Sequence, residues 1–285
     1  MDSQAILQVF LSGEFLPSNK ASLHISDLAI QRGFGVFDFF KVEKQTPLFL
    51  DDYLERFYTS ASLMYLPVPY QKEELKQIIE KLISLNNLDV SGVKMILTGG
   101  YSENGFDPAA PNLLIQQQPL TLPSADKVAK GISIITYEYL RDLPEVKSIN
   151  YTTGIRLLHH MRERKAEEVL YYINGIVTEF PRCNFFIVTD NNTLVTPSRN
   201  ILKGITRKNV LALAAKKYKV ETRDITLNEV MQAKEAFLTS STKRILPIVQ
   251  VDGNLIGAGT PGPVTLELLQ NLFALEEKVV AEVVR

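Results

Sequence analysis

Hydrophobic and polar positions along the chain change their period several times, and each change marks a predicted element. Residues 36–42 alternate with a period of two, which predicts a strand with Phe37, Phe39 and Lys41 on one face. Residues 51–65 instead repeat apolar side chains at helical spacing, with Asp51 as the expected N-cap.

The same reading along the whole chain predicts a mixture of strands and helices. Further helices are expected at 71–86, 154–166 (with Thr152 or Thr153 as the cap), 206–218, 228–233 and from about 263 onward. Strands are expected in a hairpin at 6–16, then at 48–50, 93–100, 112–120, 132–140, 146–151 (a strand or a turn), 168–173, 175–180, 184–189, 194–197, 218–225, 235–241 and 244–253. Because strands and helices do not alternate strictly, we expect an α+β fold with largely antiparallel sheets.

A polar stretch at 121–131, which contains Pro123 and Gly131, is the best candidate for a linker. It predicts a small N-terminal α/β domain over 1–120 and a larger C-terminal domain over 132–285. A chain of 285 residues is long enough for two such domains.

Composition narrows the function classes. Hydrophobic residues make up 45% and charged residues 22%, as in ordinary globular proteins, and a net charge of −1 gives no reason to expect nucleic acid or a membrane as partner. No secretory signal or membrane span is expected. A single cysteine, Cys183, excludes intrachain disulfides and agrees with a cytoplasmic location. The three histidines show no metal-ligand spacing, so no metal site is expected.

Candidate chemistry begins with one lysine in apolar surroundings. Lys147 lies among Val146, Ile149 and Tyr151, where desolvation favours the neutral amine that forms a Schiff base with a carbonyl. Glu179, in a buried-looking segment, could pair with the ring nitrogen of pyridoxal phosphate. The alternative is that Lys147 is an edge-strand lysine that protects against aggregation.

A second candidate is an anion site where a loop becomes a helix at 204–207 (G-I-T-R). The backbone N–H groups of Ile205 and Thr206 and the Thr206 hydroxyl could bind a phosphate, as could the hydroxyls at 239–242 and the guanidinium of Arg56. An ordinary helix start, a polar turn and a salt-bridge arginine remain the alternatives.

Taken in order, these segments resemble the fold type IV pyridoxal-phosphate enzymes, which include branched-chain aminotransferases, D-amino-acid aminotransferases and aminodeoxychorismate lyases. The resemblance covers roughly residues 7–275. It is carried by R-G-F-G-V-F-D (32–38), Y-L-E-R-F with Ser60 (53–60), K-S-I-N-Y (147–151), G-I-V-T-E-x4-N-F-F (175–186), L-V-T-P (194–197), I-L-K-G-I-T-R (201–207), F-L-T-S-S-T (237–242), I-L-P-I (245–248) and G-P-V-T (262–265).

The resemblance implies a role for each matching residue. Lys147 would form the Schiff base with the cofactor, Glu179 would pair with its ring nitrogen, and Tyr151 would contact its ring oxygen. The phosphate would be held by Arg56, Ile205, Thr206, Ser240 and Ser241. The family also implies two domains and a homodimer.

Substrate choice is where the sequence departs from the family. D-amino-acid aminotransferases carry an arginine for the α-carboxylate directly after the threonine that corresponds to Thr98, a predicted substrate-binding residue. Here that position is Gly99, which argues against that specificity.

The expected pocket is apolar on one side because Phe37 and Phe39 face it. Lys41, on the same face, or Arg182, after Glu179, could replace the missing arginine and bind a substrate carboxylate.

The leading hypothesis is an aminotransferase that moves the amino group of an apolar, branched-chain-like amino acid to a 2-oxo acid. An aminodeoxychorismate lyase, forming 4-aminobenzoate and pyruvate, is the first alternative, and a non-catalytic cofactor-binding relative is the second.

Overall fold

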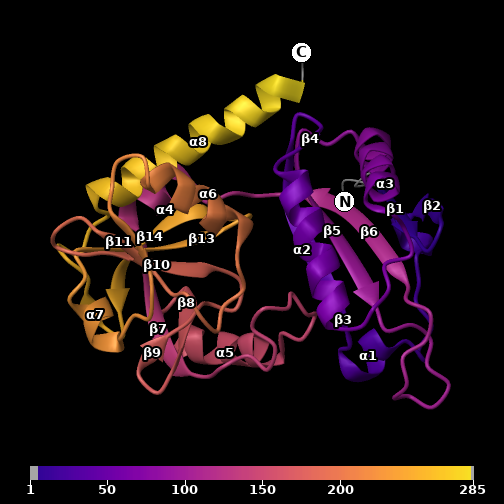
Figure 1. Cartoon of the computed structure of the whole chain (residues 1–285), viewed down its shortest axis with the longest axis horizontal. Helices are drawn as coiled ribbons and strands as arrows, with labels where there is room; N and C mark the ends of the chain where they lie inside the picture. The colour runs from indigo at the N-terminus through magenta and orange to yellow at the C-terminus, as the bar shows by residue number, and fades with distance from the viewer. Residues whose placement is uncertain (1–5, 284–285) are drawn as a thin grey trace. The chain divides into compact units, whose positions relative to one another are not determined.

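A computed structural model describes residues 6–283. The chain divides into two compact units (Figure 1). The first runs to Thr121 and also contains Val146–Asn150 and residues 279–283; the second contains Leu122–Glu145 and Tyr151–Lys278. The sequence reading thus missed that the chain returns briefly to the first unit at the segment that carries Lys147. Part of the predicted linker forms a helix of the second unit, α4 (Ala125–Lys130).

The first unit is built on an antiparallel sheet in the order β2-β1-β6-β5-β3-β4. Its strands are β1 (Gln8–Leu11), β2 (Glu14–Pro17), β3 (Gly35–Glu43), β4 (Thr46–Pro47), β5 (Val90–Thr98) and β6 (Leu113–Pro119). Its helices are the 3-10 turn η1 (Ser18–Lys20), α1 (Leu28–Arg32), α2 (Leu50–Leu63) and α3 (Lys72–Asn86). The strand predicted for 36–42 is confirmed as β3, which carries the candidate residues Phe37, Phe39 and Lys41.

The start of α2 differs from the prediction. The strand expected at 48–50 is instead β4, slightly earlier in the chain, and Phe49 caps the helix in a left-handed conformation (φ 57°). Asp51 therefore lies inside the first turn, where its carboxylate is 2.6 Å from the ammonium of Lys76. The pair lowers the pKa of Asp51, chiefly through the hydrogen bond from Lys76.

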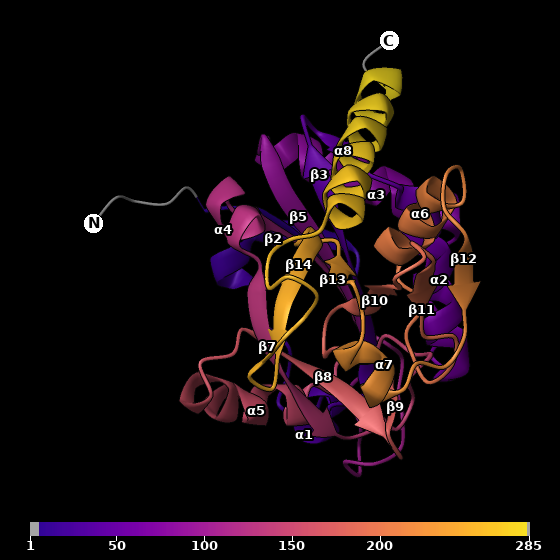
Figure 2. The same cartoon turned by 90° about the vertical axis from the view of Figure 1, so that its left-hand side faces the viewer.

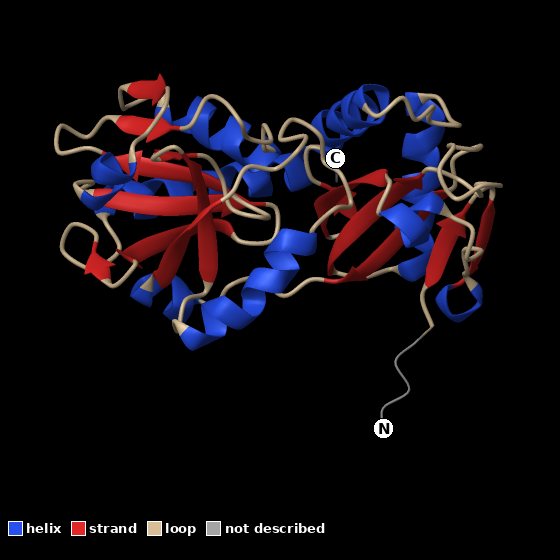
Figure 3. Cartoon of the chain, turned by 90° about the horizontal axis from the view of Figure 1, so that it is seen from below, coloured by secondary structure: helices blue, strands red, loops and turns tan. Residues whose placement is uncertain are grey.

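The second unit is built on a mixed sheet in the order β12-β11-β10-β13-β14-β7-β8-β9, with β15 beside β14 (Figure 2). Its strands are β7 (Ile132–Glu138), β8 (Glu168–Ile173), β9 (Ile176–Val177), β10 (Asn184–Val188), β11 (Leu194–Thr196), β12 (Val220–Thr222), β13 (Glu235–Ser240), β14 (Arg244–Val251) and β15 (Asn254–Leu255). Besides α4, its helices are α5 (Thr152–Glu163), α6 (Ile205–Ala214), α7 (Leu227–Met231) and most of α8 (Pro263–Val283). Antiparallel pairs dominate both sheets, which confirms the α+β prediction (Figure 3).

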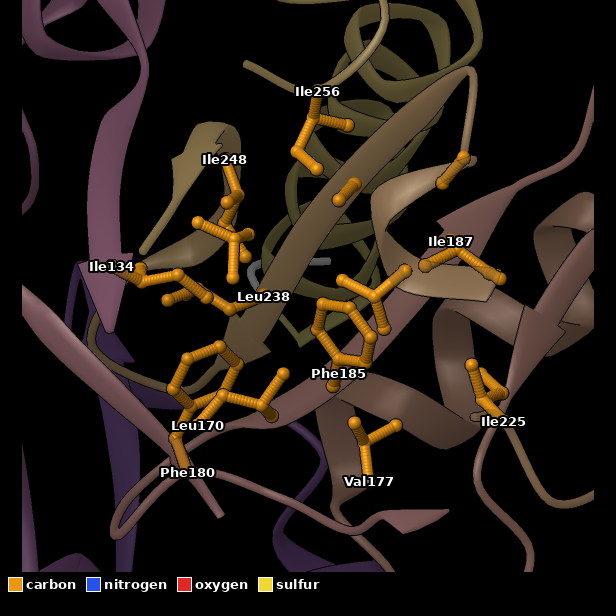
Figure 4. Packing of buried hydrophobic residues seen from close by; sticks show 14 of the residues in the cluster. Ile134, Leu170, Val177, Phe180, Phe185, Ile187, Ile225, Leu238, Ile248 and Ile256 are labelled. Atoms are coloured by element: carbon orange, nitrogen blue, oxygen red, sulfur yellow. The ribbon is translucent and has the colours of Figure 1, made fainter. Parts of the chain in front are cut away.

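Strand β10 is buried on both faces, which explains its unbroken apolar sequence. Phe185 and Ile187 belong to one hydrophobic cluster, and Phe186 and Val188 belong to the other. Figure 4 shows the first cluster, in which Phe185 lies among side chains from several strands. The second cluster includes residues of α6 and α8. A strand covered on both faces holds the segments at its two ends in fixed positions.

Two predicted caps are wrong because the backbone begins this helix differently. Helix α5 begins after Tyr151, with no side-chain hydrogen bond at the cap, so neither Thr152 nor Thr153 caps it. Segment 146–151 forms no strand and makes a single bridge, between Val36 and Ser148. None of the described helices is both long enough and apolar enough to cross a bilayer.

Candidate active site

Lys147 is held by main-chain contacts along the edge of β3. Its N–H donates to the hydroxyl of Ser60 (3.1 Å), and its carbonyl accepts from the N–H of Phe37 (2.9 Å). Two residues later, Ile149 donates to the carbonyl of Gly35 (3.1 Å). A Cβ at Gly35 would lie 2.7 Å from the carbonyl oxygen of Leu97, so glycine is needed for this close approach.

The side chain of Lys147 lies over an aromatic ring. Its ammonium nitrogen is 4.6 Å from the centroid of Phe37, and the residue is half-buried. Phe39, two residues along the same face, packs directly against Gly92: a Cβ there would lie 2.0 Å from the ring. Of the two predicted wall residues, Phe37 therefore lies beside Lys147, and Phe39 packs onto the neighbouring strand β5.

Arg56 projects from α2 onto β3. Its Nε and Nη2 donate to the two carboxylate oxygens of Asp38 (2.9 and 2.6 Å), which is fully buried, and its guanidinium lies 5.2 Å from the Tyr53 ring centroid. This two-pronged pair fixes the plane of the guanidinium. The guanidinium of Arg56 is therefore held in a fixed orientation by Asp38.

Two other candidates of this unit have local partners. Lys41 is buried (3% exposed) and its ammonium pairs with Glu43 (2.7 Å), so it is not a solvated strand-end lysine. The hydroxyl of Thr98 donates to the buried Asp27 (2.7 Å), which also accepts from Asn112 (2.9 Å). This network gives Thr98 a structural role.

In the second unit Glu179 is buried (4% exposed), and both of its carboxylate oxygens accept hydrogen bonds. Its Oε1 accepts from Nε and Nη2 of Arg141 (2.8 and 2.7 Å), and its Oε2 accepts from the N–H of Leu202 (2.8 Å). Arg141 also donates to the carbonyl of Pro144. Sequence reasoning missed Arg141 because nothing local marks a partner 38 residues away.

The segment around Glu179 is fixed to β8 and closes in a tight turn. The carbonyl of Glu179 accepts from the N–H of Tyr171 (2.9 Å), and the N–H of Phe180 donates to the carbonyl of Cys183 (2.9 Å). Arg182 stands on that turn with its side chain 66% exposed, and its Nη2 is 3.7 Å from Oε1 of Glu168. Burial raises the pKa of Tyr171.

Helix α6 begins at Gly204 with no side-chain cap, which leaves the N–H groups of its first turn, including those of Ile205 and Thr206, without capping from that residue. A Cβ on Gly204 would lie 2.0 Å from Oδ1 of Asn184, whose amide donates to the carbonyl of Leu202 (2.7 Å). The helix start is therefore pressed onto the beginning of β10.

The neighbouring strand completes a polar cradle. Asn184 pairs with Thr239 across β10 and β13, and the hydroxyl of Thr239 is buried without a hydrogen-bond partner in the described part of the chain. Ser240 and Ser241 follow directly. Uncapped N–H groups, a buried unpaired hydroxyl and two serines form a donor set that fits a phosphate. Asn184 thus lies next to both the start of α6 and Thr239, and the predicted phosphate ligands Ser240 and Ser241 follow Thr239 in the chain.

Tyr151 is the N-cap of α5 in the second unit, at the point where the chain leaves the Lys147 segment. Across residues 6–283, no group of three His, Cys, Asp or Glu side chains could hold a metal ion.

A family model described as amino-transferase class IV matches residues 35–251. The D-alanine aminotransferase of Bacillus licheniformis is 27% identical, covering 97% of this chain and 98% of that protein. A putative branched-chain-amino-acid aminotransferase of Methanocaldococcus jannaschii is 27% identical, covering 95% of this chain and 97% of that protein. Among solved structures, the branched-chain amino acid aminotransferase from Escherichia coli superposes with a TM-score of 0.87 at 24% identity, covering 95% of this chain and 94% of that chain.

The pairing of Glu179 with Arg141 can be tested by stability. We expect Arg141→Met to cost about 3–5 kcal/mol, because it leaves a buried carboxylate without its cation. Glu179→Gln added to it should recover most of that loss. Urea unfolding of the two variants measures both effects; an Arg141→Met variant as stable as the wild type would contradict the pairing.

Proposed function

Because the chain belongs to the class IV aminotransferases, we propose that it uses pyridoxal 5'-phosphate to move the amino group of an apolar amino acid to a 2-oxo acid. The observation that carries this proposal is Lys147, whose backbone is bonded on both sides while its amine lies over Phe37. The donor set at the start of α6 and the paired carboxylate of Glu179 support it.

The residues present fit the cofactor. The phosphate would be held by the first turn of α6, by Thr206, Ser240 and Ser241, and by Arg56; Glu179 would pair with the ring nitrogen and Tyr151 would contact the ring oxygen. When bound, the cofactor's ring withdraws electrons from the bond beside the substrate nitrogen. Arg141 pairs with Glu179 and balances the charge of this buried carboxylate.

Lys147 would act as the base. Its Nζ would take the proton from the substrate Cα and give a proton back on the cofactor's side of the substrate nitrogen. This proton transfer needs a short and fixed path. The main-chain bonds to Ser60 and Phe37 set the origin of that side chain, and the Phe37 ring keeps water from one side of the amine.

The pocket chemistry favours an apolar side chain. Phe37 and Phe39 supply an aromatic wall, and no arginine follows Thr98. A Cβ at Gly99 would lie 2.7 Å from Cδ1 of Phe34 and 3.0 Å from Cβ of Leu28, so this backbone has no room for a side chain at that position.

The substrate carboxylate therefore needs another cation. Arg182, two-thirds exposed, is better placed for this than Lys41, which Glu43 holds.

A D-amino acid is the second candidate donor, because curated relatives that align along nearly the whole chain include D-alanine aminotransferases. An L-branched-chain donor is favoured by the crowding at Gly99 and by the apolar wall.

We also propose a cytoplasmic homodimer. The first unit exposes Ile25 (75%), Ile30 (58%) and Phe106 (77%), apolar surface that a second copy would cover. The chain's single cysteine is a buried residue that can form no intrachain disulfide, which suits a reducing compartment.

Visible absorption of cofactor-loaded protein tests the function directly. We expect L-leucine to shift the cofactor band to that of the amine form, and D-alanine, L-glutamate and aminodeoxychorismate to be slower. Lys147→Ala should lower the transamination rate at least about 10²- to 10⁴-fold, since it removes the base. Lys147→Arg keeps a cation over Phe37 and should be equally inactive; activity in either variant would contradict the role.

The phosphate cradle is tested at Gly204. Gly204→Ala forces either Asn184 or the helix start to move, an overpacking cost of about 1–3 kcal/mol. We expect cofactor binding to weaken roughly 5- to 150-fold in equilibrium dialysis. Adding Asn184→Ala removes the obstacle and should restore part of the affinity. Unchanged affinity in Gly204→Ala would mean that the phosphate binds elsewhere.

The carboxylate role of Arg182 predicts that Arg182→Ala raises KM for the best amino donor roughly 10- to 100-fold, the loss of one charge-assisted hydrogen-bonding partner. Arg162→Ala, on the exposed end of α5, is the matched control. If the KM of Arg182→Ala equals that of the wild type in steady-state assays, the arginine does not bind the substrate.

A further inference from the structure

Glu168 is a buried carboxylate that receives two cations. It is the first residue of β8 and is 4% exposed. The ammonium of Lys243 contacts its Oε1, and Nη2 of Arg182 lies 3.7 Å from the same oxygen. The side chain of Lys243 is 20% exposed, whereas that of Arg182 is 66% exposed.

The two cations come from the two loops that carry the proposed site. Lys243 follows the serines of the phosphate cradle, and its N–H donates to the hydroxyl of Ser240 (3.2 Å). Arg182 stands on the turn that follows Glu179 and is closed by Phe180 and Cys183. Glu168 therefore joins both loops through one side chain.

The distances divide the two cations unequally. Lys243 is in direct contact with the carboxylate and balances its charge. At 3.7 Å, Arg182 is attracted to Glu168 but lies beyond hydrogen-bonding distance of it. The group of Glu168, Lys243 and Arg182 therefore carries one net positive charge, which lies on the more exposed side chain, Arg182.

We propose that Glu168 and Lys243 are positioning residues for Arg182: Lys243 neutralises Glu168, so that Arg182 is held over the turn without being bound and stays available for a substrate carboxylate. This inference rests on the proposed carboxylate role of Arg182. Neither positioning residue touches the substrate.

Without Lys243, Glu168 should compete with the substrate carboxylate for Arg182. A buried carboxylate without its close cation draws the nearest guanidinium into a direct pair. Arg182 would then donate to Glu168 instead of to the substrate, and binding of amino donor and 2-oxo acid would weaken together. The chemistry at Lys147 would be unaffected, so KM would change and kcat would not.

The same device predicts a pH dependence. Burial lowers the pKa of Lys243 to about 8; repulsion from Lys127 adds to the shift and attraction to Glu167 opposes it. Lys127 on α4 and Glu167 before β8 form an ion pair of their own, and Glu168 and Arg182 are the remaining charged groups beside the amine. While Lys243 is protonated, Glu168 is neutralised; as the pH rises and Lys243 loses its proton, Glu168 captures Arg182 and KM increases.

The test is steady-state kinetics of the cofactor-loaded enzyme, from about pH 6.5 to about pH 9.5, bracketing the Lys243 pKa. We compare the wild type with Lys243→Met, with Glu168→Gln/Lys243→Met and with Arg182→Ala. At neutral pH we expect Lys243→Met to raise KM for both substrates roughly 10- to 100-fold at unchanged kcat. The double variant should return KM close to the wild-type value, because Arg182 then has no competing carboxylate. The alkaline rise in KM should be present in the wild type and absent from both variants that lack Lys243.

Three outcomes separate this inference from the proposed function. If Arg182→Ala leaves KM unchanged, Arg182 does not bind substrate and the proposed carboxylate site fails first. If Arg182→Ala raises KM but Lys243→Met does not, the positioning role is overturned while the carboxylate site stands. If Lys243→Met raises KM and the double variant does not recover, Lys243 itself binds the substrate and the inference is overturned. Should Lys243→Met fail to fold, the double variant, which buries no unpaired charge, still decides between recovery and loss.

Discussion

A carboxylate that is buried in a protein needs hydrogen-bond donors or a cation in place of water, and Glu179 receives both from two distant parts of the chain. Arg141 supplies two N–H groups to one oxygen, and the backbone of Leu202 supplies a third donor to the other. The same guanidinium holds the carbonyl of Pro144, three residues before Lys147. One ion pair therefore fixes the exit from β7, the turn after β9 and the approach to α6, which are the segments of the second unit that the proposed chemistry uses.

The strands and helices were largely readable from the sequence because their periods are physical consequences of burial. The alternation in β3 and the double-sided apolar run of β10 each match how the strand is covered. Helix starts were less readable. Asp51 and Thr152 are good capping residues by type, yet Phe49 and Tyr151 hold the cap positions, because the chain turns at those residues before a side-chain cap is reached.

The site shows the same division between residue chemistry and residue partners. The residues with distinctive chemistry, such as Lys147, Glu179 and Arg182, stood out by type and position. Their partners did not: Arg141, Asp38 and Glu168 are ordinary charged residues whose importance comes from three-dimensional contacts. Lys41 and Thr98 illustrate the reverse case, because both stood out as pocket candidates but each pairs with an acid of the first unit. Glu43 lies two residues from Lys41 on the same strand face, whereas Asp27 is 71 residues from Thr98 and could not be read from spacing.

Two buried acids of the second unit show how partner distance decides what a charged group can do. Glu179 is paired with Arg141 at 2.7 Å, so the two charges of this pair balance each other. Glu168 is compensated by Lys243 at close contact, so a second cation at 3.7 Å keeps its charge for another anion.

With a net charge of −1 over the whole chain, attraction for an anionic substrate has to come from a local excess of positive charge and not from the overall field. The start of α6 is a second place that could attract an anion. There the attraction comes from backbone dipoles and the unpaired hydroxyl of Thr239, whereas at the turn it comes from the charge of the Arg182 side chain. Two proposed anion-binding places of different kinds would match a cofactor with a phosphate and a substrate with a carboxylate.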